Sequence, residues 1–511
     1  MTAQKDSGTR DVIPRWRSVR RTIEAGEFQS LGIPRPLDAQ HVADLARARR
    51  HWARAPNEIS AGEFVGASLV ADEPIQDESA AEVLRESSSE ILRRLASFAI
   101  DSPNPSHKKA HSDLNLEVSF GEFKRRIARG KSRVRDDPRN AIAWADLARR
   151  YTALGQFPQA DRALTLALAL APDSRYLHRI ASRFYVHIGQ PERAFWMLNS
   201  WERTQEDPWL MSALLSVASV GEIKIRSLKQ ARRIVESMNF RPIEKAELAS
   251  EVGTLELRGG NDRKARSFFK TSLTTPTDNS LAQVEWASEQ LTQLVISLAE
   301  LNVPFAAEAH ARSAAKEGRW DEAWEHAVCW LDDQPFDTEA AIFGSYVAAV
   351  AFERWDDSAE IAQIGLRARP KEVLLMNNLA YALVEGGRLQ EAADVLASVD
   401  TVGASVEDQI ALTATQGLLL FRLGDATRGF GQYQRAIEVA RQRGLTDIEG
   451  MARSMLLREE LRLNRWEEIP QLLAAVQRLV GKIEDPGVLL WVHRIEEVLR
   501  GGKASMVPKS H

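Results

Sequence analysis

The single cysteine of the chain, Cys329, follows His326 by three residues, and a thiol beside an imidazole is the pair that nucleophilic catalysis uses. The competing interpretation is structural. Cys329 falls in a helical stretch between Trp324 and Trp330, where a small apolar thiol packs well. We favour the structural interpretation. A lone cysteine also excludes an internal disulfide and a cysteine zinc cluster, so a reducing compartment fits best.

Two further motifs have the outline of a binding site. His107 and His111 could share a metal ion on one helix face, but prolines stand just upstream and no third ligand is evident. The stretch "ARGKS", residues 128–132, resembles the end of a phosphate-binding loop. Such a loop needs a glycine five residues before Gly130, where this chain has Arg125. A helical surface explains the stretch better, and we expect neither a metal site nor a cofactor.

Paired carboxylates, which acid–base catalysis would need, stand at expected helix ends in "RDDP", "LDDQP" and "WDDSA". Capping or solvation explains them there. The sequence contains no glycine-rich dinucleotide loop, serine-nucleophile elbow or zinc-protease motif. These observations argue against an enzyme, and the exception left open is an activity within residues 1–116.

Composition sets the class of protein. The 511 residues are 44% hydrophobic and 27% charged, which is typical of a folded chain, and the formal net charge is -4. This charge argues against general attraction to nucleic acid or to an anionic membrane. The start of the chain lacks an apolar signal core, and the apolar run "LTLALALA" is too short to cross a membrane. We therefore expect a cytoplasmic protein.

Candidate binding side chains must be positioned by helices, and residues 140–172 show how. Apolar residues recur there at helical spacing in two stripes, separated by a glycine and ended by a proline. The stripes and the turn consist of Trp144, Leu147, Ala148, Tyr151, Gly155, Ala160, Leu164, Ala167 and Pro172. The pattern predicts two helices that cross closely at alanine.

The same pattern returns along the chain. Good copies begin near residues 176, 247, 306, 374 and 415, and three more degenerate helical pairs lie between or after them. With its aromatic, Leu, Tyr, Ala and Pro positions, the unit resembles the tetratricopeptide repeat. The period of about 34 residues implies about nine helical pairs from 141 to 480, with an uncertain register around 279–304.

This resemblance implies an all-α fold, a right-handed α-solenoid of stacked helical hairpins, with a smaller helical N-terminal region. We predict a helical region of unknown role at 1–100, a linker at 101–116, the array with its leading capping helix at 117–480, and a C-terminal capping helix and flexible tail at 481–511. In the N-terminal region, Ser60 with Glu63 and Ser79 with Glu82 have the spacing of helix capping boxes.

In tetratricopeptide proteins the first helix of each repeat lines the concave groove. Carried over position by position, the resemblance places in this groove the residues Arg149, Arg179, Arg183, Asn377, Asn378 and Tyr381. The arginines form a cationic strip that could bind acidic side chains or a terminal carboxylate, and the asparagines could bond to a peptide backbone. Solvated polar helix faces are the alternative interpretation. The carboxylate clamp of chaperone-binding relatives is not reproduced, since Ala145, Arg149 and Ile180 replace its residues.

The leading hypothesis is a non-enzymatic scaffold or adaptor that binds a partner peptide or domain in the groove. The alternative is a regulatory or defence-type sensor whose array gates an associated effector or nucleic acid. The locally basic stretch 124–139 would serve the second hypothesis, but its aspartates and its lack of aromatics favour a solvated capping helix.

Overall fold

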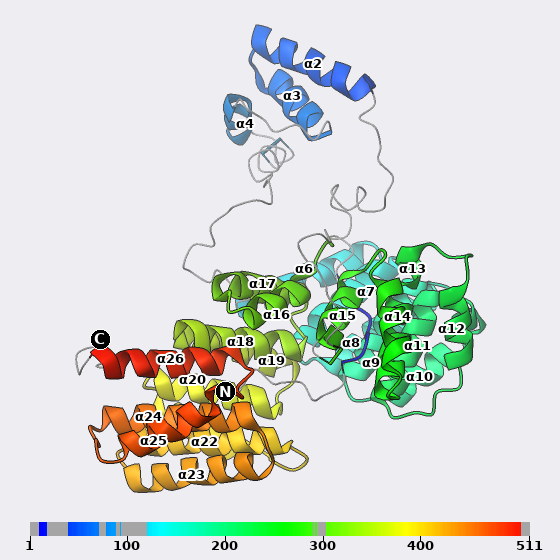
Figure 1. Ribbon diagram of the computed structural model, residues 1–511. Coiled ribbons are helices and arrows are strands. Elements are labelled where there is room, and N and C mark those ends of the chain that lie inside the picture. Colours follow the sequence, from blue (N-terminus) through cyan, green and yellow to red (C-terminus); the bar gives the residue numbers. More distant parts are fainter. Residues whose placement is uncertain are drawn as a thin grey trace. The chain divides into compact units, whose positions relative to one another are not determined.

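A computed structural model describes residues 10–17, 39–70, 78–87, 92–93, 120–288, 290–291, 294 and 303–501. All regular secondary structure in these ranges is helical, which confirms the all-α prediction (Figure 1). The chain divides into two compact units: Thr22–Leu114 forms one, and Met1–Arg21 with Asn115–His511 forms the other. Residues 10–17 therefore belong to the unit that contains the array.

The smaller unit contains helices α2 (Ala39–Arg54), α3 (Glu58–Val70) and α4 (Glu78–Arg85) around a core that includes Trp52, Phe64 and Leu84. The predicted capping box of Ser60 and Glu63 is wrong. Helix α3 begins at Glu58, and the side chain of Asn57 accepts bonds from the amides of Ile59 and Ser60. Helix α4 begins one residue before Ser79. At α3, Asn57 rather than Ser60 thus accepts hydrogen bonds from the free amides at the start of the helix. The predicted linker at 101–116, with His107 and His111, lies outside the described residues.

The larger unit is an α-solenoid of stacked helical hairpins, as predicted. Within the described residues the hairpins are α7 (Ala141–Ala153) with α8 (Phe157–Leu170), α9 (Arg175–His187) with α10 (Pro191–Asn199), α11 (Pro208–Val220) with α12 (Leu228–Glu236), α13 (Pro242–Arg258) with α14 (Asp262–Ser272), α16 (Ala307–Lys316) with α17 (Trp320–Asp333), α18 (Thr338–Phe352) with α19 (Trp355–Ala368), α20 (Val373–Glu385) with α21 (Leu389–Ser398), α22 (Val406–Arg422) with α23 (Ala426–Gln442), and α24 (Thr446–Arg462) with α25 (Ile469–Val480). A short 3-10 helix, Glu202–Gln205, precedes α11.

One helix, α15 (Asp278–Ser288), stands between the fourth and fifth of these pairs. It follows the turn after α14, and the chain is described continuously again from residue 303. This is the stretch in which the sequence register is uncertain, and the helix provides part of the groove described below.

The first hairpin shows why the sequence folds in this way. The side chain of Asn140 accepts a bond from the amide of Ala143 and so begins α7. Gly155 has a φ of 66°, a left-handed conformation that suits glycine, and it turns the chain into α8. Ala160, Leu164 and Ala167 are buried on the inner face of α8. Small buried residues let the two helices approach closely, and the side chains of the neighbouring hairpin complete the core.

Helices also cover the two ends of the array. Helix α6 (Phe120–Asp136) packs on α7 and buries Ile127 and Val134, and it contains the "ARGKS" stretch, in agreement with the helical-surface interpretation. Helix α26 (Pro486–Gly501) packs on α24, but it also contacts α18 and α16 (Figure 1). The C-terminal helix therefore ties the last hairpin to the middle of the array.

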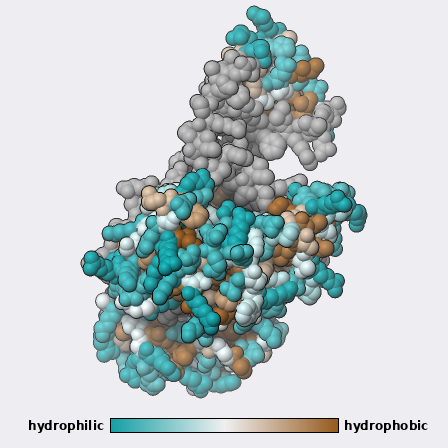
Figure 2. Space-filling model, turned by 90° about the vertical axis from the view of Figure 1, so that its right-hand side faces the viewer, coloured by the Kyte–Doolittle hydropathy of each residue, from teal (hydrophilic) through white to brown (hydrophobic). Residues whose placement is uncertain are grey.

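The surface of the molecule follows from this packing. On the face in Figure 2, hydrophilic residues predominate and hydrophobic residues form separate spots. Among the described residues, no helix is both long and apolar enough to cross a bilayer.

Candidate functional site: the groove and the segment inside it

A short segment near the start of the chain, residues 10–17, lies among the first helices of the hairpins (Figure 1). Its sequence is RDVIPRWR. Val12, Pro14 and Trp16 are buried, whereas the residues between them are partly exposed. This alternation is typical of an extended chain, in which successive side chains point in opposite directions. The segment therefore occupies the array as an extended peptide.

Side chains of α7, α9 and α15 to α18 surround residues 10–17, and the surface that they form is called the groove below; several of them bind the backbone of the segment. Asn279 of α15 donates its amide to the carbonyl of Ile13 at 2.9 Å, and Gln283, one turn further along α15, donates to the carbonyl of Arg10 at 2.8 Å. At the other end, Arg149 Nε of α7 donates to the carbonyl of Trp16 at 2.8 Å. The hydroxyl of Tyr176 of α9 donates to the next carbonyl, that of Arg17, at 2.9 Å. These bonds hold a main chain irrespective of its side chains.

Trp16 is the apolar anchor of the segment. It is completely buried, and its ring meets Phe336 edge-on at a centroid distance of 5.6 Å and Phe184 at 6.4 Å. The guanidinium groups of Arg149 and Arg183 lie within 6.0 Å of the centroid of the Phe336 ring, one of the two rings that contact Trp16. An aromatic side chain enclosed in this way contributes a large buried area in one defined orientation.

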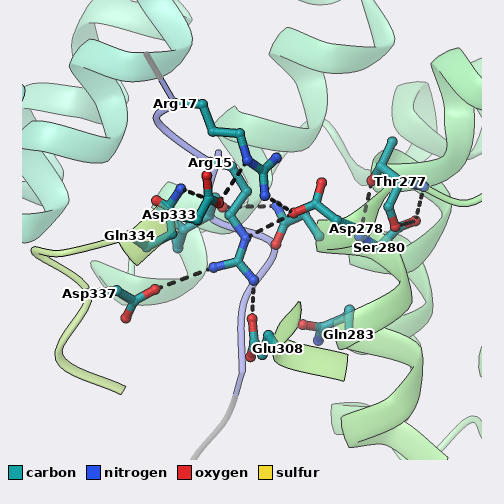
Figure 3. Close-up of polar contacts among 12 residues, drawn as sticks. Arg15, Arg17, Thr277, Asp278, Ser280, Gln283, Glu308, Asp333, Gln334 and Asp337 are labelled. Atoms are coloured by element: carbon teal, nitrogen blue, oxygen red, sulfur yellow. Dashed lines mark hydrogen bonds and ion pairs between the residues drawn. The ribbon is translucent and has the colours of Figure 1, made fainter. Parts of the chain in front are cut away.

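The arginines on either side of Trp16 meet carboxylates from opposite walls of the groove (Figure 3). Arg17 pairs with Asp278 at 2.7 Å and with Asp333 at 2.8 Å. Arg15 pairs with Glu308, with Asp337 at 3.3 Å and with Asp278 at 3.4 Å. These four acids come from α15, α16, the end of α17 and the start of α18.

The surroundings of these pairs set their charge states. Burial by itself would lower the pKa of Arg15, but the charges of Glu308, Asp278 and Asp337 outweigh it and raise that pKa. Burial would likewise raise the pKa of Glu308, but Arg10 and Arg15 hold it well below its ordinary value. Arg10 reaches both oxygens of Glu308, at 3.0 and 2.9 Å. Arg15 and Glu308 are therefore both charged. Each has a partner of opposite charge, without which a buried ion would be strongly destabilising.

At the start of the segment two acids, Asp11 and Glu251, influence each other through their charges. The amide of Val12 donates to Glu251 of α13 at 3.0 Å, and Arg258 pairs with Asp11 at 2.9 Å. Burial, followed by the neighbouring charge of Asp11, raises the pKa of Glu251 to about 8. Burial also raises the pKa of Asp11, although Arg258 opposes this. The buried pair therefore holds a proton above the ordinary carboxyl pKa.

The three arginines predicted for the groove do lie on its first helices. Arg149 contacts the segment, as described, and also the backbone carbonyl of Asp333. Arg179 pairs with Glu247 and stacks on Trp209, and Arg183 pairs with Asp337 at 3.4 Å. Carboxylates of this chain thus pair with two of the three predicted arginines, Arg179 and Arg183, and the occupant of the groove is basic rather than acidic. Binding of a separate partner by these arginines stays a prediction.

The predicted groove residues of the later repeat are buried between helices. Asn377 accepts a bond from Thr415 at 2.8 Å, and Asn378 donates to Ser345 at 3.0 Å. The hydroxyl of Tyr381 contacts the sulfur of Met455 at 3.7 Å, and burial raises its pKa. The three side chains are at most 4% exposed. The neighbouring helices α18, α22 and α24 cover these positions, and their role in binding a partner stays a prediction.

Chain comparison adds two distant similarities. Neither the known protein families nor the curated proteins match this chain. The crystal structure of yeast Tom70 shares 12% identity over 91% of this chain and 97% of that one, with a TM-score of 0.28. The human IFIT1 dimer with PPP-AAAA shares 14% identity over 82% of this chain and 93% of that one, with a TM-score of 0.31. Scores this low carry no argument about function.

The stretch around Cys329 differs from the sequence interpretation. Cys329 is exposed on α17 rather than packed, whereas Trp324 and Trp330 on the same helix are buried. His326 stacks on His310 at a centroid distance of 4.9 Å, and burial lowers the pKa of both rings. In the part of the chain that the structure describes, no group of three or more His, Cys, Asp or Glu side chains has the arrangement to hold a metal ion.

Residues 10–17 and the acids that bind them were not predicted from the sequence as parts of the site. A signal was present, since RDVIPRWR contains three arginines and a tryptophan in eight residues. The contacts join residues up to 322 positions apart, as between Arg15 and Asp337, so nothing in the local pattern reveals the pairing.

Proposed function

We propose that this protein is a non-enzymatic interaction scaffold of the tetratricopeptide type, placed in the cytoplasm, whose concave groove binds an extended segment of a protein partner. The observation that carries the proposal is the set of bonds from Asn279, Gln283, Arg149 and Tyr176 to four backbone carbonyls of residues 10–17. Peptide-binding proteins gain affinity from such main-chain bonds and specificity from side-chain pockets.

The position of these donors supports the proposal further. They stand on α7, α9 and α15, the first helices of their hairpins or the single helix beside them, and so face the same side of the solenoid. Asn279 and Gln283 are one helical turn apart and bind carbonyls three residues apart in the segment. Two amide side chains on one helix face therefore hold two carbonyls of the segment.

The test is binding of a labelled peptide of residues 10–17 to the full chain carrying Arg15→Glu and Trp16→Ala, which weaken its own segment. Fluorescence anisotropy should show saturable binding. Adding Asn279→Ala removes one hydrogen bond, worth about 0.5–1.5 kcal/mol, and should weaken binding by roughly 2- to 12-fold.

Asn239→Ala is the matched control, because Asn239 is exposed in the loop before α13. It should leave the affinity unchanged. If the folded chain with the weakened segment does not bind the peptide, or if both asparagine variants bind equally well, the groove does not have the proposed function.

A further inference from the structure

The segment in the groove has a marked chemical character. It contains three arginines and one aspartate in eight residues, with Trp16 between two of the arginines. The walls present Asp278, Glu308, Asp333 and Asp337 to these cations. A buried aromatic pocket with carboxylates on both sides is a specific arrangement, since the acids select charge and the rings select shape.

We infer that the groove recognises, in a partner protein, an extended segment with an aromatic residue between two basic ones, and that residues 10–17 hold the groove shut until such a segment displaces them. The inference rests on the proposed function and adds the class of partner and its regulation.

The geometry around the cations favours arginine at both positions. Arg17 directs Nη2 to Asp278 and Nε to Asp333, so one planar guanidinium bridges two acids that lie 55 positions apart in the chain. Arg15 likewise reaches three carboxylates with its three nitrogens. Lysine presents a single nitrogen and cannot bridge in this way. A partner segment with lysines should therefore bind more weakly than one with arginines.

The chain is built so that the segment can leave without unfolding the array. Residues 10–17 are joined to α6, the first helix of the array, only through the other compact unit, Thr22–Leu114. The four carbonyl bonds and the ion pairs are contacts of side chains with the segment, and residues 10–17 contribute no helix to the solenoid.

Covalent attachment gives the segment an advantage over a free peptide. A tethered ligand acts at an effective concentration that reaches the millimolar range for short linkers and falls for longer ones. A free peptide with micromolar affinity therefore competes poorly with the intact segment and well with a weakened one. Regulation by a tethered competitor predicts this difference.

The experiment compares the same labelled peptide, RDVIPRWR, on the wild-type chain and on the full chain with Arg15→Glu and Trp16→Ala. The altered chain should bind it at least about 10-fold more tightly, because its own segment competes less. Equal affinity for the two chains would show that residues 10–17 do not close the groove, and it would leave the proposed function intact.

Altered peptides test the class of partner on the same chain. Replacing the tryptophan by alanine, or both flanking arginines by glutamate, should weaken binding at least about 10-fold, replacement of tryptophan by phenylalanine should weaken it least, and two lysines should lie between. Equal binding of all peptides would mean that the groove binds only the backbone. This outcome would overturn the inferred preference for an aromatic residue between two basic ones, and it would leave the proposed function intact. If none binds, both proposals fail.

A measurement on the wild type covers the case in which the altered chain does not fold. Excess unlabelled RDVIPRWR should accelerate amide hydrogen exchange in residues 10–17, including the amide of Val12 that Glu251 binds, while the array keeps its protection. The peptide with both flanking arginines changed to glutamate is the control. Unchanged exchange with both peptides would overturn displacement.

Discussion

At the scale of single residues, Glu251 carries a clear functional consequence. It lies beside Asp11 in a buried place, it binds the amide of Val12, and Arg258 and Arg10 face it as cations. The ordinary pKa of 4.5 rises to about 8, so the folded protein keeps a proton that the unfolded chain releases. The stabilisation that this proton provides is complete below the ordinary pKa and is lost as the pH rises through about 8.

We therefore predict that Glu251→Gln flattens the pH dependence of stability. Between pH 7 and 9 the wild type should lose about 1 kcal/mol of unfolding free energy through this group, because the pH then passes the raised pKa of Glu251 and the folded protein loses its extra proton. Glutamine keeps an acceptor for the amide of Val12 but does not titrate. Urea unfolding at the two pH values measures the difference.

Glu206→Gln is the control for this change, since Glu206 is exposed before α11. It should follow the wild type. A wild type whose stability is the same at both pH values would contradict the assigned protonation of Glu251.

At the scale of elements, helix α26 shows how one side chain can fasten a helix to a distant one. Arg494 of α26 donates to the carbonyls of Val350, at 2.8 Å, and Ala351, near the C-terminal end of α18. Those carbonyls have no later turn of helix to bond with, and the helix dipole places negative charge there. The guanidinium also lies 5.2 Å from the ring centroid of Trp491 on its own helix, which helps to orient it toward α18.

Arg494→Met should lower the free energy of unfolding by about 1–2 kcal/mol, because charged hydrogen bonds to otherwise free carbonyls are lost while much of the apolar side chain remains. Urea denaturation measures the loss. Arg500→Met is matched in chemistry and lies on the same helix, but Arg500 is exposed and pairs with Glu496 one turn away. Such a surface pair contributes little, so this control should change stability by less than about 0.5 kcal/mol. Equal effects of the two variants would rule out the bridging role.

At the scale of the whole array, early and middle hairpins contact each other. Helix α19 touches α7, and Arg369, just after α19, donates to the carbonyl of His187 at the end of α9 at 2.9 Å. Gly155, in the first hairpin turn, lies so close to the carbonyl of Arg367 that a Cβ atom has no room. The solenoid thus returns on itself beside the groove that holds residues 10–17.

A pair of glycine variants isolates this contact. Gly155 and Gly189 have left-handed φ angles of 66° and 74°, so alanine costs roughly 1–2 kcal/mol of backbone strain at either site. Only at Gly155 would the added methyl group also meet the backbone of Arg367, since the space around Gly189 is open. Gly155→Ala should therefore destabilise the protein more than Gly189→Ala in thermal unfolding. Equal destabilisation would mean that the two parts of the solenoid separate easily.

Local pattern predicted most of the architecture. Trp144, Tyr151, Gly155 and Ala160 belong to one hairpin, and the contacts that define them lie within about one repeat, so a repeat period exposes them. It predicted less of the site. Arg149, Arg179 and Arg183 lie on the expected helices, but the groups that they bind come from other hairpins: the backbone carbonyl of Asp333 and the carboxylates of Glu247 and Asp337. Asn378 was expected to be exposed in the groove, but it is buried because α18 packs on α20.

The amino-acid sequence by itself determined a helical array, since each hairpin is specified by residues close together in the chain and each needs a neighbour to bury its apolar face. Only the tertiary structure decided what lies inside it. The acids of α15, α16 and the α17–α18 turn face one point because the solenoid curves, and that curvature is the sum of many hairpin packings. Residues 10–17 meet them across more than 260 positions of sequence, a distance at which composition and periodicity contain no information about pairing.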